Sequence, residues 1–314
     1  MTLIAIIKRN VVKVKILRLT IGFCSRFLHT IQFLTTQKNK RLLLNSWMNL
    51  NGNKLHKNNW GDDINYWFLR ELTDKKIYNY SNLINWMLPK TESNIMAIGS
   101  IIGFLCQSNS IIWGSGVMNA QDVISLKPKK VLAVRGPLTR KVLLSNGIDC
   151  PKVYGDPALL LSSYYQPKVM KKYKVGIIPH YVDLQNTLVL SFINGNNDIL
   201  LIDIKNYGDW HEIPDKINQC ELILSSSLHG LIISDAYNIP NVWVSFSEGL
   251  ISGGKFKFLD YFASVNRETL NPIKIEELAD FQRAISAKDK WNKISFNSQH
   301  LIDCCPFVIN KIIS

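Results

Sequence analysis

A single histidine follows three serines at the start of an apolar segment, in the run Ser225-Ser226-Ser227-Leu228-His229-Gly230. An imidazole can exchange protons near neutral pH. Serine hydroxyls and backbone amides at the start of a helix can bind an anion. These residue types therefore predict acid–base chemistry on an anionic substrate. A histidine that merely begins a helix is the alternative interpretation, and the segment by itself leaves both open.

The flanking residues predict where this histidine lies in a fold. Residues 222–224 form a short apolar run typical of a parallel strand buried on both faces. Apolar residues then recur at helical spacing over 228–236, and Asn238 with Pro240 ends the helix. We therefore expect His229 in the first turn of a helix at the carboxyl edge of a sheet, where open α/β sheets bind their ligands.

A second segment, residues 129–148, has the same organisation. Its apolar residues at 131–134 predict a strand, Arg135 follows directly, and Pro137 suits the first turn of the next helix. A guanidinium group matches the geometry of a phosphate or a carboxylate. Arg135 is thus a candidate anion clamp, with an ordinary surface arginine as the alternative.

Polar, charged and small residues also stand at the ends of other predicted strands and at the starts of other predicted helices. The turn at 114–116 would let backbone amides approach a ligand. Each of these positions has a structural explanation as well, such as capping a helix or reversing the chain. They are Asn59, Asp62, Gly114, Ser115, Gly116, Asp156, His180, Lys255 and Lys257.

Composition describes a folded, strongly basic protein. The 314 residues are 46% hydrophobic and carry a net charge of +13, and this charge is concentrated because eleven Lys and Arg residues but no Asp or Glu precede Asp62. Residues 1–41 predict a basic amphipathic segment, which either contacts an anionic membrane surface or packs as an ordinary first helix. No nucleic-acid-binding module is recognisable, so nucleic acid is not an expected partner.

The six cysteines indicate a reducing compartment. They show no C-x-x-C spacing, and Cys304 and Cys305 are adjacent, which suits neither a disulfide framework nor a zinc site. Neither a signal peptide nor a membrane-spanning run is expected, so we predict a cytoplasmic location. The histidines and carboxylates form no helix-spaced ligand pair, and we expect no metal.

Predicted strands alternate with predicted helices in both halves of the chain, which favours an α/β fold of two doubly wound, Rossmann-like domains facing a cleft. The polar segment 162–173 is the expected linker. We predict an amino-terminal domain over 42–168 and a carboxy-terminal domain over 169–314, whose last helix packs across the junction. Residues 51–59 are expected to form a loop, and the tail 287–314 is expected to be helical.

Seven motifs, in this order, resemble the polysaccharide pyruvyl transferase family, and the likeness spans residues 58–265. They are NWGDDIN (59–65), GSG (114–116), VRGPLT (134–139), YGDPALLL (154–161), IIPHY (177–181), SSSLHGLIISDAYNIP (225–240) and KFKFLDYF (255–262).

The resemblance implies a fold similar to the two-domain GT-B glycosyltransferases. It also implies transfer of the enolpyruvyl group of phosphoenolpyruvate to a sugar of a cell-surface polysaccharide, or to its lipid-linked repeat unit. The product would be a pyruvate ketal, with phosphate released, and no cofactor beyond the donor substrate would be needed. The enzyme would work in the cytoplasm, at the inner face of the membrane if residues 1–41 bind there.

The resemblance also implies roles for the candidate residues. His229 and Arg135 are the expected catalytic residues. Donor binding is expected from Ser226, Ser227, Leu228, Gly230, Lys255 and Lys257. Acceptor binding or orientation is expected from Asn59, Asp62, Gly114, Ser115, Gly116, Asp156 and His180.

One departure from the family affects the donor site. Some members carry an arginine where this chain has Ser227, so another cation must bind the donor here. Arg135, Arg140, Lys255 and Lys257 are the available cations. The alternative functions are a glycosyltransferase of the same fold that uses a sugar nucleotide, and a non-catalytic scaffold for polysaccharide synthesis.

Overall fold

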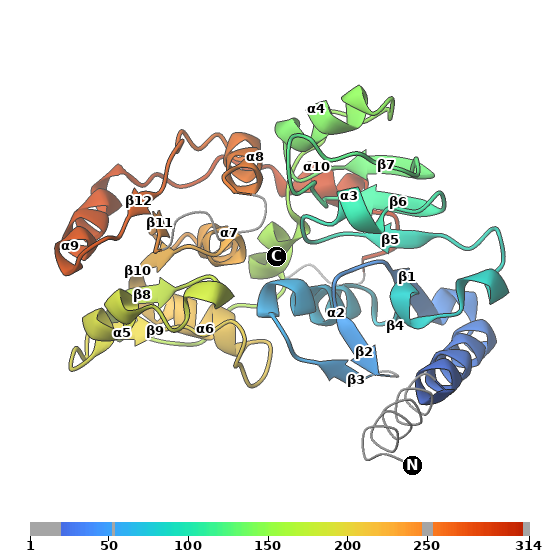
Figure 1. Cartoon of the computed structure of the whole chain (residues 1–314), viewed down its shortest axis with the longest axis horizontal. Helices are drawn as coiled ribbons and strands as arrows, with labels where there is room; N and C mark the ends of the chain where they lie inside the picture. Colours follow the sequence, from blue (N-terminus) through green and yellow to red (C-terminus); the bar gives the residue numbers. More distant parts are fainter. Residues whose placement is uncertain (1–19, 52–53, 247–253, 310–314) are drawn as a thin grey trace, which may run out of the picture.

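Two parallel sheets of five strands each lie side by side in the computed structural model, which describes residues 20–51, 54–246 and 254–309 (Figure 1). The first sheet has the order β4-β1-β5-β6-β7 and the second the order β12-β11-β10-β8-β9. The predicted α/β class with parallel, Rossmann-like sheets is thereby confirmed. The finer GT-B arrangement of two domains stays a prediction.

The strands of the first sheet all lie within residues 41–133, and those of the second within 173–274. The bounds are β1 (Arg41–Leu44), β4 (Lys76–Asn79), β5 (Asn94–Met96), β6 (Ser110–Trp113), β7 (Lys130–Ala133), β8 (Tyr173–Ile178), β9 (Ile199–Leu201), β10 (Cys220–Ser225), β11 (Asn241–Ser245) and β12 (Ile273–Lys274).

Helices flank and separate the sheets, and residues 20–35 form a further helix at the lower right of Figure 1. The α-helices are α2 (Trp60–Thr73), α3 (Ile102–Leu105), α4 (Pro137–Ser145), α5 (Thr187–Ile193), α6 (Glu212–Asn218), α7 (Leu228–Ala236), α8 (Phe256–Ser264), α9 (Leu278–Ser286) and α10 (Ser298–Asp303). Short 3-10 helices are η1 (Lys38–Lys40), η2 (Tyr80–Asn82), η3 (Asn85–Met87), η4 (Pro157–Ser163), η5 (Tyr181–Asp183) and η6 (Ala287–Lys290).

One local prediction was wrong, and a second is confirmed only in part. Part of the expected loop at 51–59 belongs to an antiparallel hairpin of β2 (Asn49–Asn51) and β3 (Lys54–His56), in which Leu50 pairs with Leu55 and both are buried. One apolar residue per strand is too short a pattern to predict a strand. The described part of the tail 287–314 is helical only in η6 and α10.

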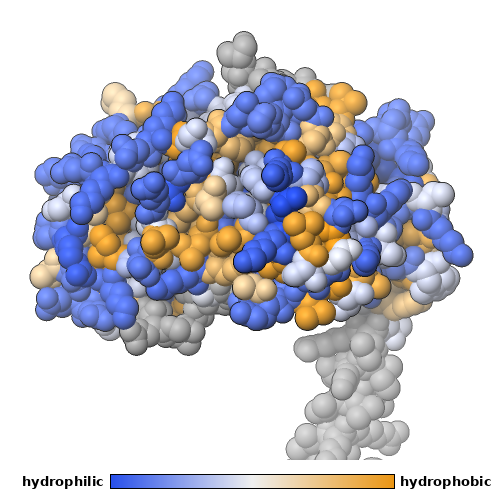
Figure 2. All heavy atoms as spheres, turned by 90° about the horizontal axis from the view of Figure 1, so that it is seen from above, coloured by the Kyte–Doolittle hydropathy of each residue, from blue (hydrophilic) through white to orange (hydrophobic). Residues whose placement is uncertain are grey.

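The surface is mostly hydrophilic in the view from above, with hydrophobic side chains gathered in patches near its middle and right (Figure 2). None of the helices in the described ranges is long and apolar enough to cross a membrane. All six cysteines are unpaired. The described residues contain no group of three or more His, Cys, Asp or Glu side chains placed to hold a metal ion.

The two halves of the chain share one hydrophobic core, which contains Trp60 and Trp113 together with Ile223 and Leu231. Polar contacts also cross the junction. Trp60 donates its backbone amide to the Ile204 carbonyl at 2.8 Å and its indole N–H to the Trp210 carbonyl at 2.8 Å. These contacts hold the start of α2 against the second half of the chain.

A buried ion pair fastens α4 to α8. Arg135 Nε lies 3.0 Å from Asp260 Oδ2, and both side chains are 0% exposed. The Thr139 amide and hydroxyl donate to the same carboxylate at 2.8 and 2.6 Å. A Cβ on Gly136 would lie 2.0 Å from the Asp260 carbonyl oxygen, so this close packing requires glycine. The VRGPLT motif therefore docks one half of the chain on the other.

Asp260→Ala should lower the free energy of unfolding by about 3–5 kcal/mol, because it leaves a buried guanidinium without its counterion. Urea unfolding followed by circular dichroism measures the change. The control is Asp198→Ala, which removes the exposed partner of Lys174 and should have little effect. An equal, small effect of both substitutions would show that the buried pair does not join the two halves.

Candidate active site

A cavity of about 490 Å³ opens between the two sheets, with walls from both halves of the chain. Its lining combines polar and charged side chains with an aromatic part. The lining residues are Trp47, Asn58, Asn59, Asp62, Gly99, Ser100, Ile101, Phe104, Met118, His180, Tyr181, Lys205, Ser227, Leu228, His229 and Lys257.

The amino-terminal ends of three helices meet at this cavity. Asn59 caps α2, and its Oδ1 accepts a hydrogen bond from the Gly61 amide at 3.1 Å. Ser227 directly precedes α7, and Lys257 lies in the first turn of α8. Each helix end carries partial positive charge, although the first amides of α2 already donate to Ile204 and Asn59. Their convergence favours an anionic ligand.

His229 lies in the first turn of α7, as the sequence predicts, and contributes to the cavity wall. Its Nε2 atom is buried and has no hydrogen-bond partner in the structure. Burial, and then the charges of Lys257 and Arg135, lower the pKa of this imidazole to about 3. The ring is thus neutral at physiological pH, and its Nε2 atom has no hydrogen-bond partner among the described residues beside the cavity.

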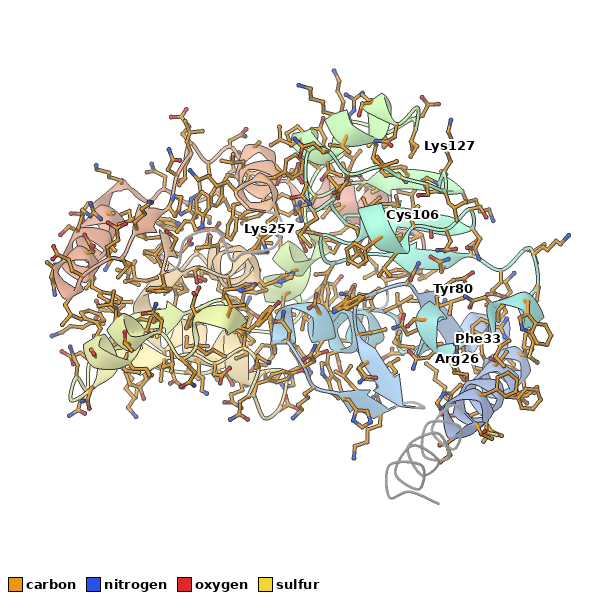
Figure 3. All side chains as sticks on the ribbon, in the orientation of Figure 1. Arg26, Phe33, Tyr80, Cys106, Lys127 and Lys257 are labelled. Carbon is orange, nitrogen blue, oxygen red and sulfur yellow. The ribbon has the colours of Figure 1, made fainter. Side chains whose placement is uncertain are left out.

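Asp62 and Lys257 titrate closer to neutrality. Burial and the neighbouring Asp63 raise the pKa of Asp62 to about 7. Burial and the charge of Arg135 lower the pKa of Lys257 to about 8. Figure 3 shows Lys257 in the middle of the molecule, between the two sheets. The cavity therefore holds a carboxyl group and an amine that can each change protonation state near pH 7.

His180 is the second imidazole of the cavity. It follows β8, and its backbone amide donates to Ser226 Oγ at 2.8 Å, so the end of β10 positions it. Its Nδ1 atom is buried without a partner in the structure, and its ring lies 4.3 Å from that of Tyr181. Burial and the charge of Lys257 lower the pKa of His180 to about 4.

Arg135 lies behind the cavity rather than on its wall. Besides Asp260, its guanidinium donates to Ser100 Oγ and, at 2.9 Å, to the Val117 carbonyl. Ser100 itself lines the cavity. Arg135 therefore reaches the site through Ser100 and through its charge, which lowers the pKa values of His229 and Lys257. Direct contact between Arg135 and a substrate stays a prediction.

Several other predicted site residues support the cavity without lining it. Ser226 Oγ donates to Asp183 at 3.2 Å, and a Cβ on Gly230 would lie 2.4 Å from Ser225 Oγ. Ser115 donates to the Ala97 carbonyl at 3.0 Å. Lys255 is exposed and bonds Asn271 at 2.6 Å. Ser226, Gly230 and Ser115 thus fix the backbone around the cavity, whereas Lys255 lies outside it.

The predicted glycine turn and Asp156 have structural contacts as well. A Cβ on Gly114, whose φ is +95°, would lie 2.2 Å from Pro157, and one on Gly116 would lie 2.4 Å from the Arg135 guanidinium carbon. Asp156 caps η4 through the Ala158 amide at 3.0 Å. Burial raises the pKa of Asp156 to about 6. None of the three lines the cavity.

The sequence analysis missed an aromatic and apolar part of the cavity. The rings of Trp47 and Phe104 meet edge to face, with centroids 5.7 Å apart, and both side chains are exposed. Tyr181 and Met118 line the cavity too, and Lys205 Nζ lies 5.5 Å from the Tyr181 ring centroid. Trp47 lies three residues beyond β1, and isolated aromatic residues are usually core residues, so the sequence held no signal for this part of the cavity.

Comparison of the sequence with known protein families identifies the family to which this chain belongs. Residues 38–248 match the family described as Polysaccharide pyruvyl transferase. This range includes Asp62, His180 and His229 but ends before Lys257.

The chain also resembles two individual proteins. It is 30% identical over 209 residues to Uncharacterized protein L143 of Acanthamoeba polyphaga mimivirus, covering 65% of this chain and 70% of the viral protein. It is 26% identical over 212 residues to Succinoglycan biosynthesis protein ExoV of Rhizobium meliloti (strain 1021), covering 65% of this chain and 60% of that protein. The solved structure of a functionally uncharacterised protein from Klebsiella pneumoniae aligns with 74% of this chain and 90% of that chain, at 11% sequence identity and a TM-score of 0.38.

Gly61→Ala should displace His229, since the new Cβ would lie 2.1 Å from Nδ1 of its ring. We expect the free energy of unfolding to fall by about 1–3 kcal/mol, the usual range for an overpacked interior. The chemical shifts of His229 in NMR spectra should change as well. The control is Gly22→Ala, where a Cβ meets nothing within 4 Å and helix propensity should slightly favour alanine. Unchanged His229 shifts in Gly61→Ala would contradict this packing.

Asp62→Asn should raise the melting temperature near pH 8 and leave it almost unchanged near pH 4. The pKa of Asp62 is raised from 3.8 to about 7, so its effect on stability is most favourable at low pH and declines as pH rises from about 4 to 7. Asparagine cannot ionise and removes this decline. Asp280, whose pKa is lowered by the Glu276 amide, is the control: Asp280→Asn should lose stability near pH 8. Equal pH dependence of Asp62→Asn and the wild type would exclude the raised pKa.

Proposed function

Because the chain belongs to the polysaccharide pyruvyl transferase family and is a transferase, we propose that its cavity transfers the enolpyruvyl group of phosphoenolpyruvate to a sugar. The acceptor is a sugar of a cell-surface polysaccharide or of its lipid-linked repeat unit, and the reaction takes place in the cytoplasm. The observation that carries this proposal is the meeting of three helix amino-terminal ends with His229 and Lys257 at one cavity.

The donor is small and carries a phosphate and a carboxylate, so it requires several N–H donors and cations close together. The amide groups that begin α7 and α8 and the ammonium group of Lys257 supply them. Of the four cations considered as replacements for the arginine absent at Ser227, Lys257 is the one that lines the cavity. Arg140 donates to the Cys150 carbonyl at 3.0 Å, away from the cavity.

Ketal formation requires balanced proton movements. The methylene carbon of the donor gains a proton, two sugar oxygens bond to its central carbon, and the bond from that carbon to the phosphate oxygen breaks. The two sugar hydroxyls lose one proton each. One of these protons balances the proton gained by the methylene carbon, and the other leaves with the phosphate or passes to solvent.

Two groups are suited to move these protons. Asp62, with a pKa of about 7, can take a proton from a hydroxyl and return it within one catalytic cycle. His229 presents an unpartnered Nε2. An anion bound beside His229 would raise its pKa, since opposite charge favours the protonated form. We assign His229 to the donor and Asp62 to the acceptor hydroxyls.

The aromatic part of the cavity suits the acceptor. The exposed, adjoining rings of Trp47 and Phe104 offer an apolar surface to the C–H face of a sugar ring, while Asn59 and Asp62 offer polar groups to its hydroxyls. Arg135 is a positioning residue in this arrangement, because it contacts Ser100 and holds α8 through Asp260.

Phosphate release from phosphoenolpyruvate, measured with a soluble sugar acceptor, tests these roles. His229→Ala should lower kcat by about 10²–10⁴-fold, the usual contribution of a positioned acid or base. Asp62→Asn should remove the limb of the pH–rate profile near pH 7. Lys257→Met should raise the KM for the donor, whereas Lys255→Met, two residues away but bonded to Asn271 outside the cavity, should not.

The outcomes separate this function from others. Unchanged phosphate release in both His229→Ala and Asp62→Asn would refute the assigned roles. Thermal stabilisation by nucleotide sugars, with none by phosphoenolpyruvate, would instead favour a glycosyltransferase.

A further inference from the structure

The helix formed by residues 20–35 has its apolar side turned outward. A surface helix of a globular protein ordinarily buries its apolar stripe and exposes its polar side. Here the exposed positions recur at helical spacing and form one face, with Leu28 61% and Phe23 57% exposed. We call this face the amino-terminal apolar face. Its residues are Ile21, Phe23, Phe27, Leu28 and Ile31.

The opposite side of this helix is already occupied. Phe33 is fully buried with Tyr78 and Leu83, and Arg26 Nη2 donates to the Leu83 carbonyl at 2.7 Å. Thr30 Oγ1 accepts the Ile84 amide at 2.9 Å. Figure 3 shows Arg26 and Phe33 beside Tyr80 at the lower right of the molecule. Turning the helix to bury its apolar face would therefore break these contacts.

An exposed tryptophan lies in the segment that packs on the other side of this helix. The bonds to Leu83 and Ile84 hold the segment that follows η2 against the helix, and Trp86, two residues further on, is 81% exposed. Tryptophan is enriched where a membrane meets water, because its ring is apolar and its N–H is polar. The exposed apolar residues gathered on one face of the helix mark an interaction site.

The charge of the surrounding residues favours an anionic membrane over a second copy of the chain as the partner of this surface. Residues 1–40 contain eight Lys and Arg residues and no Asp or Glu, and Lys38 and Lys40 are exposed just beyond the helix. Anionic lipid attracts such a segment, by about 1 kcal/mol for each basic residue near the surface. A second copy of the chain would bring the same positive charges together, and repulsion would oppose the contact.

We propose that the amino-terminal apolar face lies in the boundary between headgroups and acyl chains of an anionic membrane, with the helix in the plane of the surface. Apolar side chains supply the insertion and basic residues the attraction, as in other interfacial amphipathic helices. The proposal does not depend on the reaction catalysed in the cavity. It places the enzyme on the surface that would carry a lipid-linked acceptor.

Sedimentation of the full chain with lipid vesicles tests the proposal. The wild type should bind vesicles of phosphatidylcholine mixed with phosphatidylglycerol, and it should bind less in high salt or to phosphatidylcholine alone. Phe27→Ser combined with Leu28→Ser should weaken binding by about tenfold or more. The matched control, Val123→Ser with Leu270→Ser, changes two exposed apolar residues elsewhere and should bind like the wild type.

Two further measurements distinguish failure of this proposal from other failures. Circular dichroism and activity on a soluble acceptor should be the same in the Phe27/Leu28 variant and the wild type, since neither residue lines the cavity. Equal vesicle binding by that variant and the wild type would overturn the proposal. A concentration-dependent dimer in analytical ultracentrifugation, abolished by the same substitutions, would overturn it in favour of a second copy.

Discussion

The ion pair between Arg135 and Asp260 is the interaction on which the site depends. Separating two charges that are both fully buried is costly, because neither can be solvated. The pair therefore holds α4 and α8 together. Asp260 lies one helical turn beyond Lys257, so the position of the cavity's ammonium group follows from it. On the other side, the same guanidinium contacts Ser100, which lines the cavity.

The electrostatics of the cavity favour an anionic ligand before any proton moves. Lys257 and Arg135 each lower the pKa of His229, and Arg135 lowers that of Lys257. Burial is the larger cause of both shifts, and groups whose pKa values are perturbed in this way concentrate at functional sites. A bound anion would interact favourably with these cations and would raise the pKa values of His229 and Lys257.

The sequence alone determined the class of fold and much of the site. Alternating apolar runs and helical periodicities predicted the α/β class, the strands at 131–134 and 222–224 and the position of His229 at the start of α7. Seven predicted site residues line the cavity: Asn59, Asp62, His180, Ser227, Leu228, His229 and Lys257. These predictions succeeded because strand ends and helix starts are local features, and the carboxyl ends of parallel strands share one edge of a sheet.

Tertiary structure decided what depends on residues distant in sequence. The sequence predicted Arg135 as an anion clamp. In the structure its guanidinium pairs with Asp260, which is 125 residues away in the chain. Trp47 and Phe104 are distant in sequence, and their rings meet on the cavity wall only because separate elements pack together. The raised pKa of Asp62 and the lowered pKa of His229 come mainly from burial. Periodicity specifies which residues form a strand or helix, but the partner of a charge and the loss of its water are set by how separate elements pack.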